Sequence, residues 1–235
     1  MDLSHRTGQA LLADIDSLAI VRNPIIESFL YESKFMMISA DPGVGKSIIS
    51  TQGALCIASG TPLFGSFQVP SARKVVYVQL EGDYAEFLER IRGMRTVIPL
   101  NVENIHWIDR MFMDCSNVQS REQLFEEIEH VWVPDVVILD PLYMLTPHDI
   151  ASEKGSKSIV AFLKLMRKRF GCAVWINHHT HRAKYDRGQK VDEDDPYFGS
   201  QWLKAHMDIC YYMKKQGKDH KGAGLFCTKD RSKTV

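Results

Sequence analysis

One short stretch, ISADPGVGKSIIS at residues 38–50, constrains the fold of this chain more than any other. It reads Ala40-x-x-x-x-Gly45-Lys46-Ser47, a phosphate-binding loop with alanine in place of the usual first glycine. Its glycines allow successive backbone N–H groups to turn inward on phosphate oxygens, and the helix that follows adds the positive end of its dipole. The apolar run before the loop and the helical pattern after it supply the strand–loop–helix context that the motif requires.

Each residue type in this loop has a chemical role. Lys46 would reach the β- and γ-phosphates of a nucleotide, and the Ser47 hydroxyl would ligate Mg²⁺. The alternative, a glycine-rich turn that happens to precede a lysine, is disfavoured because both flanks agree with the motif. The residues expected to bind the nucleotide are Ala40, Asp41, Pro42, Gly43, Val44, Gly45, Lys46, Ser47 and Ile48.

Composition sets wide bounds on the class of protein. A chain of 235 residues, 45% of them hydrophobic, can bury one large core, as a single α/β domain does. The formal net charge is zero, so contact with nucleic acid would depend on local basic patches. The sequence contains neither a membrane-spanning apolar segment nor a signal-peptide pattern, and its five scattered cysteines are typical of reduced core residues. We therefore expect a cytoplasmic protein with no membrane partner.

Apolar runs alternate with helical patterns, which indicates an α/β fold with a mainly parallel sheet and helices on both faces. A candidate capping box, Ser120 with Gln123, would begin the fourth helix. We expect an N-terminal helical segment over 1–21, a candidate subunit-docking arm, and one α/β domain over 22–235. Strands are expected at 34–39, 74–80, 104–108, 135–140, 172–177, 207–213 and 224–229, and helices at 7–18, 46–59, 83–94, 120–131 and 155–170.

Two acidic residues follow buried strands. The segment PDVVILDPL runs into Asp140, and VVYVQLEGD runs into Glu81. The carboxyl ends of parallel strands converge on one crevice, where Asp140 could hold a water of the Mg²⁺ shell and Glu81 could deprotonate the attacking water. The alternatives are a turn-forming aspartate before Pro141 and a glutamate that caps the helix beginning near Asp83. Position alone leaves the two options for Glu81 equally open.

The cluster INHHTH, with His178, His179 and His181, suggests a metal site at first sight. Neighbouring residues on a strand point to opposite faces, however, and no cysteine or aspartate completes a ligand set. A metal site at these histidines is therefore disfavoured.

Taken in order, the segments ISADPGVGKSIISTQGALCIASGTPLFGSFQVPSARKVVYVQLEGD, VVILDPLYML and AVWINHHTHRAK are similar to the RecA-like ATPases of the RepA type, relatives of the DnaB replicative helicases. The resemblance covers residues 22–233. It implies a RecA-like P-loop NTPase core that binds ATP and Mg²⁺, with Glu81 as the catalytic base. It also implies hexameric rings that hydrolyse ATP at subunit interfaces while single-stranded DNA passes through the centre. The family usually continues with a further strand beyond KDRSKTV, so we expect this chain to be either a domain cut from a longer protein or an unusually short member.

The resemblance assigns further roles. A polar residue at the end of the INHHTH strand contacts the γ-phosphate in the family, which implies His178, with His179 as the second choice. A Lys-x-Arg pair reaches the neighbouring subunit's site in the family, and Lys229 and Arg231 match it. The alternative for that pair is two exposed, solvated charges. Arg90 in FLERIRG is the candidate adenine contact.

Two segments, 144–157 and 179–200, would face the centre of such a ring. Basic side chains neutralise backbone phosphates and an aromatic ring such as that of Tyr185 can stack a base, a mix that suits single strands. The alternative is a solvated loop, because the acidic run at 192–195 cancels much of the charge. The residues expected to bind DNA are Lys154, Lys157, Arg182, Lys184 and Arg187.

We interpret the sequence as an ATP-hydrolysing DNA motor, in its simplest form a hexameric replicative helicase domain with primase or other replication proteins as further partners. The alternative is a RecA-superfamily ATPase that does not unwind DNA, such as a recombination mediator, a loader or a KaiC-like regulator. The segments GTPLFGSF and VQLEGD fit the RepA type better. A small-molecule kinase is disfavoured because no arginine-rich lid follows the third strand.

Overall fold

The computed structural model describes residues 7, 9, 23–110, 112–150, 152–180, 201–216 and 222–231. Its centre is a seven-stranded sheet in the order β5-β4-β6-β7-β3-β8-β9, in which all neighbours are parallel except β8 and β9. The strands are β3 (Phe35–Ala40), β4 (Val75–Gln79), β5 (Ile105–Asp109), β6 (Val136–Asp140), β7 (Ala173–His179), β8 (Ile209–Gln216) and β9 (Gly222–Asp230). A separate hairpin consists of β1 (Pro24–Ile26) and β2 (Leu30–Tyr31).

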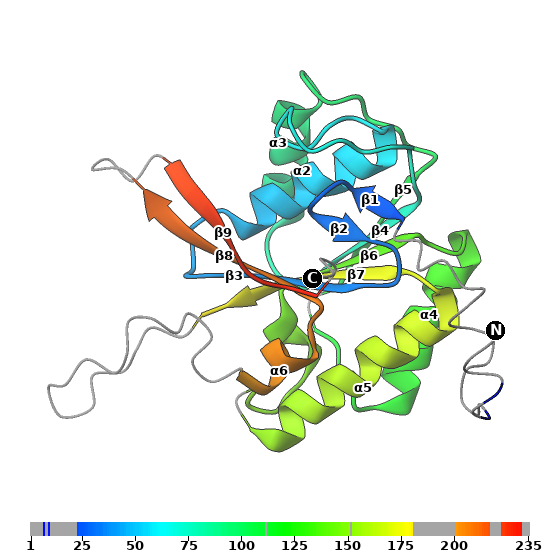
Figure 1. Ribbon diagram of the computed structural model, residues 1–235. Coiled ribbons are helices and arrows are strands. Elements are labelled where there is room, and N and C mark those ends of the chain that lie inside the picture. The colour runs from blue at the N-terminus through cyan, green and yellow to red at the C-terminus, as the bar shows by residue number, and fades with distance from the viewer. Residues whose placement is uncertain are drawn as a thin grey trace, which may run out of the picture.

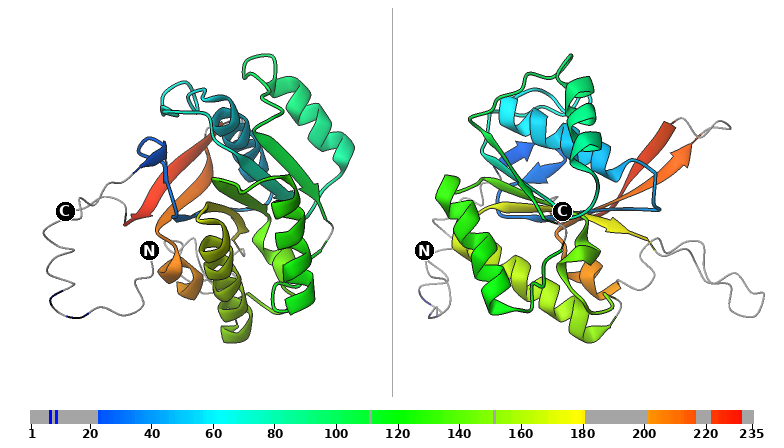
Figure 2. Two further views of the ribbon diagram at one scale, coloured as in Figure 1. Left: turned by 90° about the vertical axis from the view of Figure 1, so that its right-hand side faces the viewer. Right: turned by 180° about the vertical axis from the view of Figure 1, so that it is seen from behind.

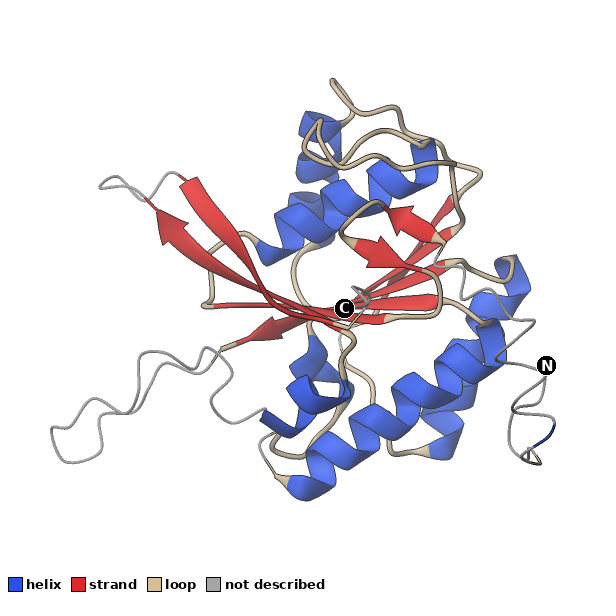
Figure 3. Cartoon of the chain, viewed as in Figure 1, coloured by secondary structure: helices blue, strands red, loops and turns tan. Residues whose placement is uncertain are grey.

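Helices cover both faces of the sheet (Figure 1, Figure 3). On one face lie α2 (Lys46–Ser59) and α3 (Tyr84–Met94). On the other lie α4 (Val118–Val131), α5 (Glu153–Phe170) and α6 (Gln201–His206), together with the short 3₁₀ helix η1 (Leu142–Leu145). The two further views of Figure 2 show the same three layers from the side and from behind. The expected α/β architecture, a mainly parallel sheet between two helical layers, is confirmed.

Successive residues of each central strand belong to two different cores. Met36 and Ile38 pack into the core on the α2 side, whereas Met37 packs into the core on the α5 side. Both faces of β3, β4 and β6 are fully buried, which explains why these strands read as continuous apolar runs instead of alternating ones.

The predicted strands and four of the predicted helices are confirmed to within a few residues. The proposed capping box was wrong, because α4 begins at Val118 and the side chain of Asn117 accepts the Ser120 backbone N–H at 3.0 Å. Asparagine is among the best N-cap residues, worth about 1 kcal/mol over alanine. Most of the predicted helix 7–18 and of the segment 1–21 lies outside the described residues, so the boundary at 21/22 stays a prediction.

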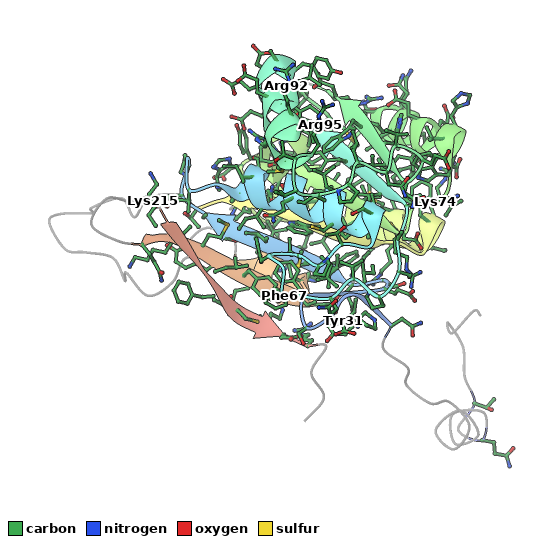
Figure 4. The ribbon with its side chains drawn as sticks, turned by 90° about the horizontal axis from the view of Figure 1, so that it is seen from above. Tyr31, Phe67, Lys74, Arg92, Arg95 and Lys215 are labelled. Atoms are coloured by element: carbon green, nitrogen blue, oxygen red, sulfur yellow. The ribbon has the colours of Figure 1, made fainter. Side chains whose placement is uncertain are left out.

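Strands β8 and β9 continue beyond the parallel sheet as a two-stranded ribbon. The pairing of β3 with β8 ends at Ala40 opposite Met213, but β8 and β9 stay paired as far as Gln216 opposite Gly222. Lys215 lies near the end of this ribbon, as Figure 4 shows. No residue of β9 is buried, and beyond Met213 no further described strand pairs with either edge of this ribbon.

The cysteines behave as expected of core residues, with one exception. Cys56, Cys115, Cys172 and Cys210 are buried thiols, whereas Cys227 is exposed, and all five are free. Burial raises the pKa of the Cys56 and Cys115 thiols to about 11. No helix within the described part of the chain is both long and apolar enough to cross a membrane.

Candidate active site

The carboxyl ends of four parallel strands meet at a cavity of about 350 Å³. It lies between the phosphate loop after β3, the ends of β4, β6 and β7, and the first turns of α3. Ligand sites of open α/β sheets occur at this edge. Of the residues predicted for the site, the cavity is lined by Gly43, Ser47, Glu81, Arg90, Asp140 and His179.

The backbone of the phosphate loop is shaped for an anion. Gly43 and Gly45 have φ angles of +72° and +109°, a region that side chains rarely adopt, and nothing lies within 4 Å of where a Cβ of Gly43 would be. Helix α2 begins after Gly45 with no side-chain cap, which leaves its first N–H groups for a ligand. Ala40 is fully buried, so a small residue fits there in place of the usual glycine. These features fit the phosphates of a nucleotide.

Lys46 is buried, at 4% exposed, directly before Ser47 of the cavity lining. Its ammonium donates to the carbonyl oxygens of Ala40 at 2.7 Å and Asp41 at 3.1 Å, and lies 3.3 Å from Nδ1 of His179. Burial lowers the Lys46 pKa to about 8, and the carboxylates of Asp140, Asp41 and Glu81 oppose that shift. The effect of burial on the Lys46 ammonium is therefore larger than that of the three nearby carboxylates. A bound phosphate would supply a further negative charge next to the ammonium.

Asp140 ends β6 with only 6% of its surface exposed. Its Oδ2 accepts a hydrogen bond from the Tyr77 hydroxyl at 2.5 Å, and it lines the same cavity as Ser47. A carboxylate and a hydroxyl oxygen are hard donors of the kind that Mg²⁺ prefers. This donor set fits Mg²⁺ held by Ser47 directly and by Asp140 through water.

Glu81 does not cap α3. The N-cap is Asp83, whose carboxylate accepts the Ala85 backbone N–H at 2.7 Å. The Glu81 carboxylate instead faces the cavity and accepts a hydrogen bond from the Tyr143 hydroxyl of η1. Burial and the Glu81 carboxylate raise the Tyr143 pKa to about 12, so this tyrosine stays a donor at neutral pH. Sequence reasoning missed Tyr143, because its place in the LDPLYML segment carries no signal of its own.

The geometry favours His179 over our first choice, His178, as the phosphate-sensing residue. His178 is 4% exposed and does not line the cavity, whereas His179 lines it beside Lys46. The reason is that side chains along β7 alternate between the two faces of the sheet. His178 shares a face with Ile176, which belongs to the α5-side core. His179 shares the other face with Trp175, which belongs to the α2-side core.

Lys229 and Arg231 lie away from their own chain's phosphate loop. Lys229 pairs with Cys210, which lies opposite Met37 in the middle of β3, before the strand end that carries the loop. Its ammonium donates to the backbone oxygens of Lys204 and Ala205 at the end of α6. Arg231 follows β9 and is exposed. Neither residue contributes to the cavity formed by its own chain.

The remaining predicted residues divide into three groups. In the loop, Pro42 is exposed, Val44 packs against the α2-side core and Ile48 is 52% exposed. Lys154 is exposed in the first turn of α5, and Lys157 there pairs with Glu153. The other predicted DNA contacts, Arg182, Lys184 and Arg187, lie outside the described residues.

Comparison with known proteins agrees with this geometry. The family model described as AAA domain matches residues 5–184. No curated protein matches the chain. Among solved structures, one ATPase domain has a TM-score of 0.61 at 15% identity and covers 87% of this chain and 80% of its own.

Two archaeal proteins share the fold to a similar extent. A KaiC-like protein of the hyperthermophile Pyrococcus horikoshii has a TM-score of 0.56 at 13% identity, covering 88% of this chain and 83% of its own. The flagellar accessory protein FlaH of Methanocaldococcus jannaschii has a TM-score of 0.55 at 14% identity, covering 86% and 80%. The chain therefore belongs to the AAA-domain family and has the fold of the RecA-like P-loop ATPases.

Proposed function

We propose that this RecA-like ATPase domain is a cytoplasmic motor on single-stranded DNA, the ATPase domain of a hexameric replicative helicase. One observation carries the proposal: the backbone N–H of Thr180 donates to the Ala40 oxygen at 3.1 Å, and its hydroxyl donates to Asp41 Oδ1 at 2.5 Å. Thr180 immediately precedes the segment 181–200, which contains most of the predicted DNA contacts. A movement of the phosphate loop during hydrolysis would therefore displace Thr180 and, through it, the start of that segment.

The residues around the cavity divide the work of hydrolysis. Lys46 places its charge on the β- and γ-phosphates, Ser47 and Asp140 hold Mg²⁺, and Glu81 accepts the proton of the attacking water. When bound, Mg²⁺ neutralises charge on the phosphate oxygens. In this scheme His179, which lies beside Lys46 and directly precedes Thr180, contacts the γ-phosphate. In the same scheme Arg90, on the α3 wall of the cavity, contacts the nucleotide.

The start of α5 offers a second basic surface near the same edge of the sheet. Lys154 and Lys157 follow β6 by way of η1, so they leave the edge that carries the phosphate loop. Because Lys157 is paired with Glu153, Lys154 is the stronger candidate for a DNA phosphate.

We expect single-stranded DNA to stimulate ATP hydrolysis. Replacing Arg182, Lys184 and Arg187 together with glutamine should remove that stimulation and weaken DNA binding. The slope of log K against log salt should fall by about 2, because each lost phosphate contact removes about 0.7 for single strands. Fluorescence anisotropy at several salt concentrations measures both quantities.

A matched control replaces three exposed basic residues of α3 and α5 with glutamine: Arg92, labelled in Figure 4, and Lys164 and Lys168. The salt slope of this control should equal that of the parent. A slope unchanged in the first variant as well would identify 181–200 as a solvated surface segment.

The second candidate function is a RecA-superfamily ATPase that does not unwind DNA. The support for this second candidate is the similarity to a KaiC-like protein and to FlaH, with TM-scores close to that of the solved ATPase domain. Opening of a forked duplex distinguishes the two candidates. ATP hydrolysis that is indifferent to single-stranded DNA would favour the second.

We also propose that Arg231 acts on the ATP of a neighbouring subunit, since it is exposed and remote from its own phosphate loop. Arg231→Ala should then bind ATP but hydrolyse little of it. In equal mixture with Glu81→Gln subunits, about a quarter of the interfaces of a closed ring would combine an intact Glu81 with an intact Arg231, so activity should partly return. Mixed rings, verified by native mass measurement, that are no more active than the separate variants would refute this role.

A further inference from the structure

A buried chain of hydrogen bonds runs beneath the phosphate loop to Asp140. Trp175 Nε1 lies 3.3 Å from Asn177 Oδ1, and Asn177 Nδ2 lies 2.8 Å from Ser50 Oγ. Ser50 Oγ lies 2.9 Å from the Tyr77 hydroxyl, which lies 2.5 Å from Asp140 Oδ2. Four of these side chains are at most 1% exposed, and Asp140 is 6% exposed. The chain joins β7, α2, β4 and β6, which together carry much of the site.

Chemistry fixes the donor at three of the four contacts in this chain, while the single Ser50 hydrogen also lies within reach of the Lys46 and Ser47 carbonyl oxygens at 3.2 and 3.3 Å. An ionised carboxylate only accepts, so Tyr77 donates to Asp140, and the Tyr77 oxygen is then able to accept from Ser50. The indole N–H of Trp175 only donates, so Asn177 presents its carbonyl to the indole and its NH₂ group to Ser50. When Ser50 donates to Tyr77, its shortest oxygen contact at 2.9 Å, the donors from Trp175 to Tyr77 all point toward the carboxylate. Such aligned bonds strengthen one another in a buried environment.

This chain ties together the two elements that supply the Mg²⁺ ligands. Ser50 lies one turn after Ser47 on α2, and Tyr77 connects it to Asp140 on β6. Helix α2 lies close to β7 at this level, because a Cβ on Gly53 would be 2.5 Å from the Trp175 ring. The spacing between Ser47 and Asp140 is thus fixed by packing at Gly53 and by hydrogen bonds through Tyr77.

We propose that Tyr77 is a positioning residue for the metal site: its hydroxyl holds Oδ2 of Asp140, so that the other carboxylate oxygen is kept for the Mg²⁺ shell beside Ser47. Tyr77 does not line the cavity, so it acts on the site through Asp140. The inference rests on the proposed ATP–Mg²⁺ site but is independent of any action on DNA.

The test measures binding of a fluorescent, non-hydrolysable ATP analogue with Mg²⁺ and with EDTA. Tyr77→Phe keeps the ring and removes the hydroxyl. Its affinity in EDTA should stay within about twofold of the parent, while the gain in affinity on adding Mg²⁺ should fall by about tenfold, the usual effect of losing a hydrogen bond to a charged group.

Ser50→Ala keeps the Tyr77–Asp140 hydrogen bond but removes the Ser50 hydroxyl that contacts Tyr77, so it should reduce the Mg²⁺ gain by a smaller factor. Because both act on one chain, the double variant should lose less than the product of the two factors.

Tyr211→Phe is the matched control. Tyr211 is another buried tyrosine, and its hydroxyl lies 3.3 Å from the Ser28 carbonyl oxygen. This variant should lower the melting temperature without altering the Mg²⁺ gain. If Tyr77→Phe, or Ser50→Ala where the first does not fold, keeps the parental Mg²⁺ gain, the chain is only structural and the inference is wrong. A parent protein whose nucleotide affinity ignores Mg²⁺ would instead overturn the metal site and this inference together.

Discussion

Replacing Lys46 with alanine should abolish ATP hydrolysis and leave the fold intact. The change removes the ammonium that we expect to reach the β- and γ-phosphates, and loss of such a charge-stabilising donor costs about 10²–10³-fold or more in turnover. Stability should be retained because the ammonium is buried at an electrostatic cost, which is the cause of its lowered pKa. Phosphate release and thermal melting measure the two effects.

Lys164→Ala on the exposed face of α5 controls for the loss of one lysine. It should hydrolyse ATP at the parental rate. If Lys46→Ala did the same, the loop at residues 38–50 would not be a nucleotide site at all.

The second large effect is expected for Glu81→Gln. Glutamine keeps the shape of the side chain and an oxygen that can accept the Tyr143 hydroxyl, but it is not a base. ATP should therefore still bind, while turnover falls by about 10²-fold or more. Single-turnover hydrolysis and equilibrium binding of ATP separate the two quantities.

Glu89→Gln on the exposed side of α3 is the control for Glu81→Gln, and its turnover should match the parent. Equal losses of binding and turnover in Glu81→Gln would mean that the side chain supports the site's structure. Since Asp83 already caps α3, such a structural role would have to come from the contact with Tyr143.

The phosphate loop and the ends of β4 and β6 could be predicted because their signals are local. Positive φ angles require glycine at Gly43 and Gly45, and an apolar run that stops at Asp140 marks the end of a buried strand. Such local signals cannot decide which of two adjacent strand residues faces the site. His178 and His179 differ only in strand parity, and a register error of one residue exchanges the two faces.

Other parts of the site depend on contacts between distant segments. The contact of Lys229 with α6 could not be foreseen, because six residues are too few for a periodic pattern. Tyr77 and Asp140 are 63 positions apart, and only the order of strands in the sheet brings them together. Hydroxyl donors such as the buried Tyr77 and the 39% exposed Tyr143 have no sequence signature, since tyrosine is common both in cores and at surfaces.

The ribbon formed by β8 and β9 has a consequence for local unfolding. Beyond Met213, β8 pairs with β9 and no longer with β3, and no residue of β9 is buried, whereas β3, β4 and β6 are buried along their whole length. Within one domain, the free energy of local unfolding ranges from near zero at such exposed margins to the free energy of global unfolding in the core. Amide hydrogens of the ribbon should therefore exchange with solvent many times before those of the central strands exchange once. The chain can loosen at this margin while the strands that hold the phosphate loop stay closed.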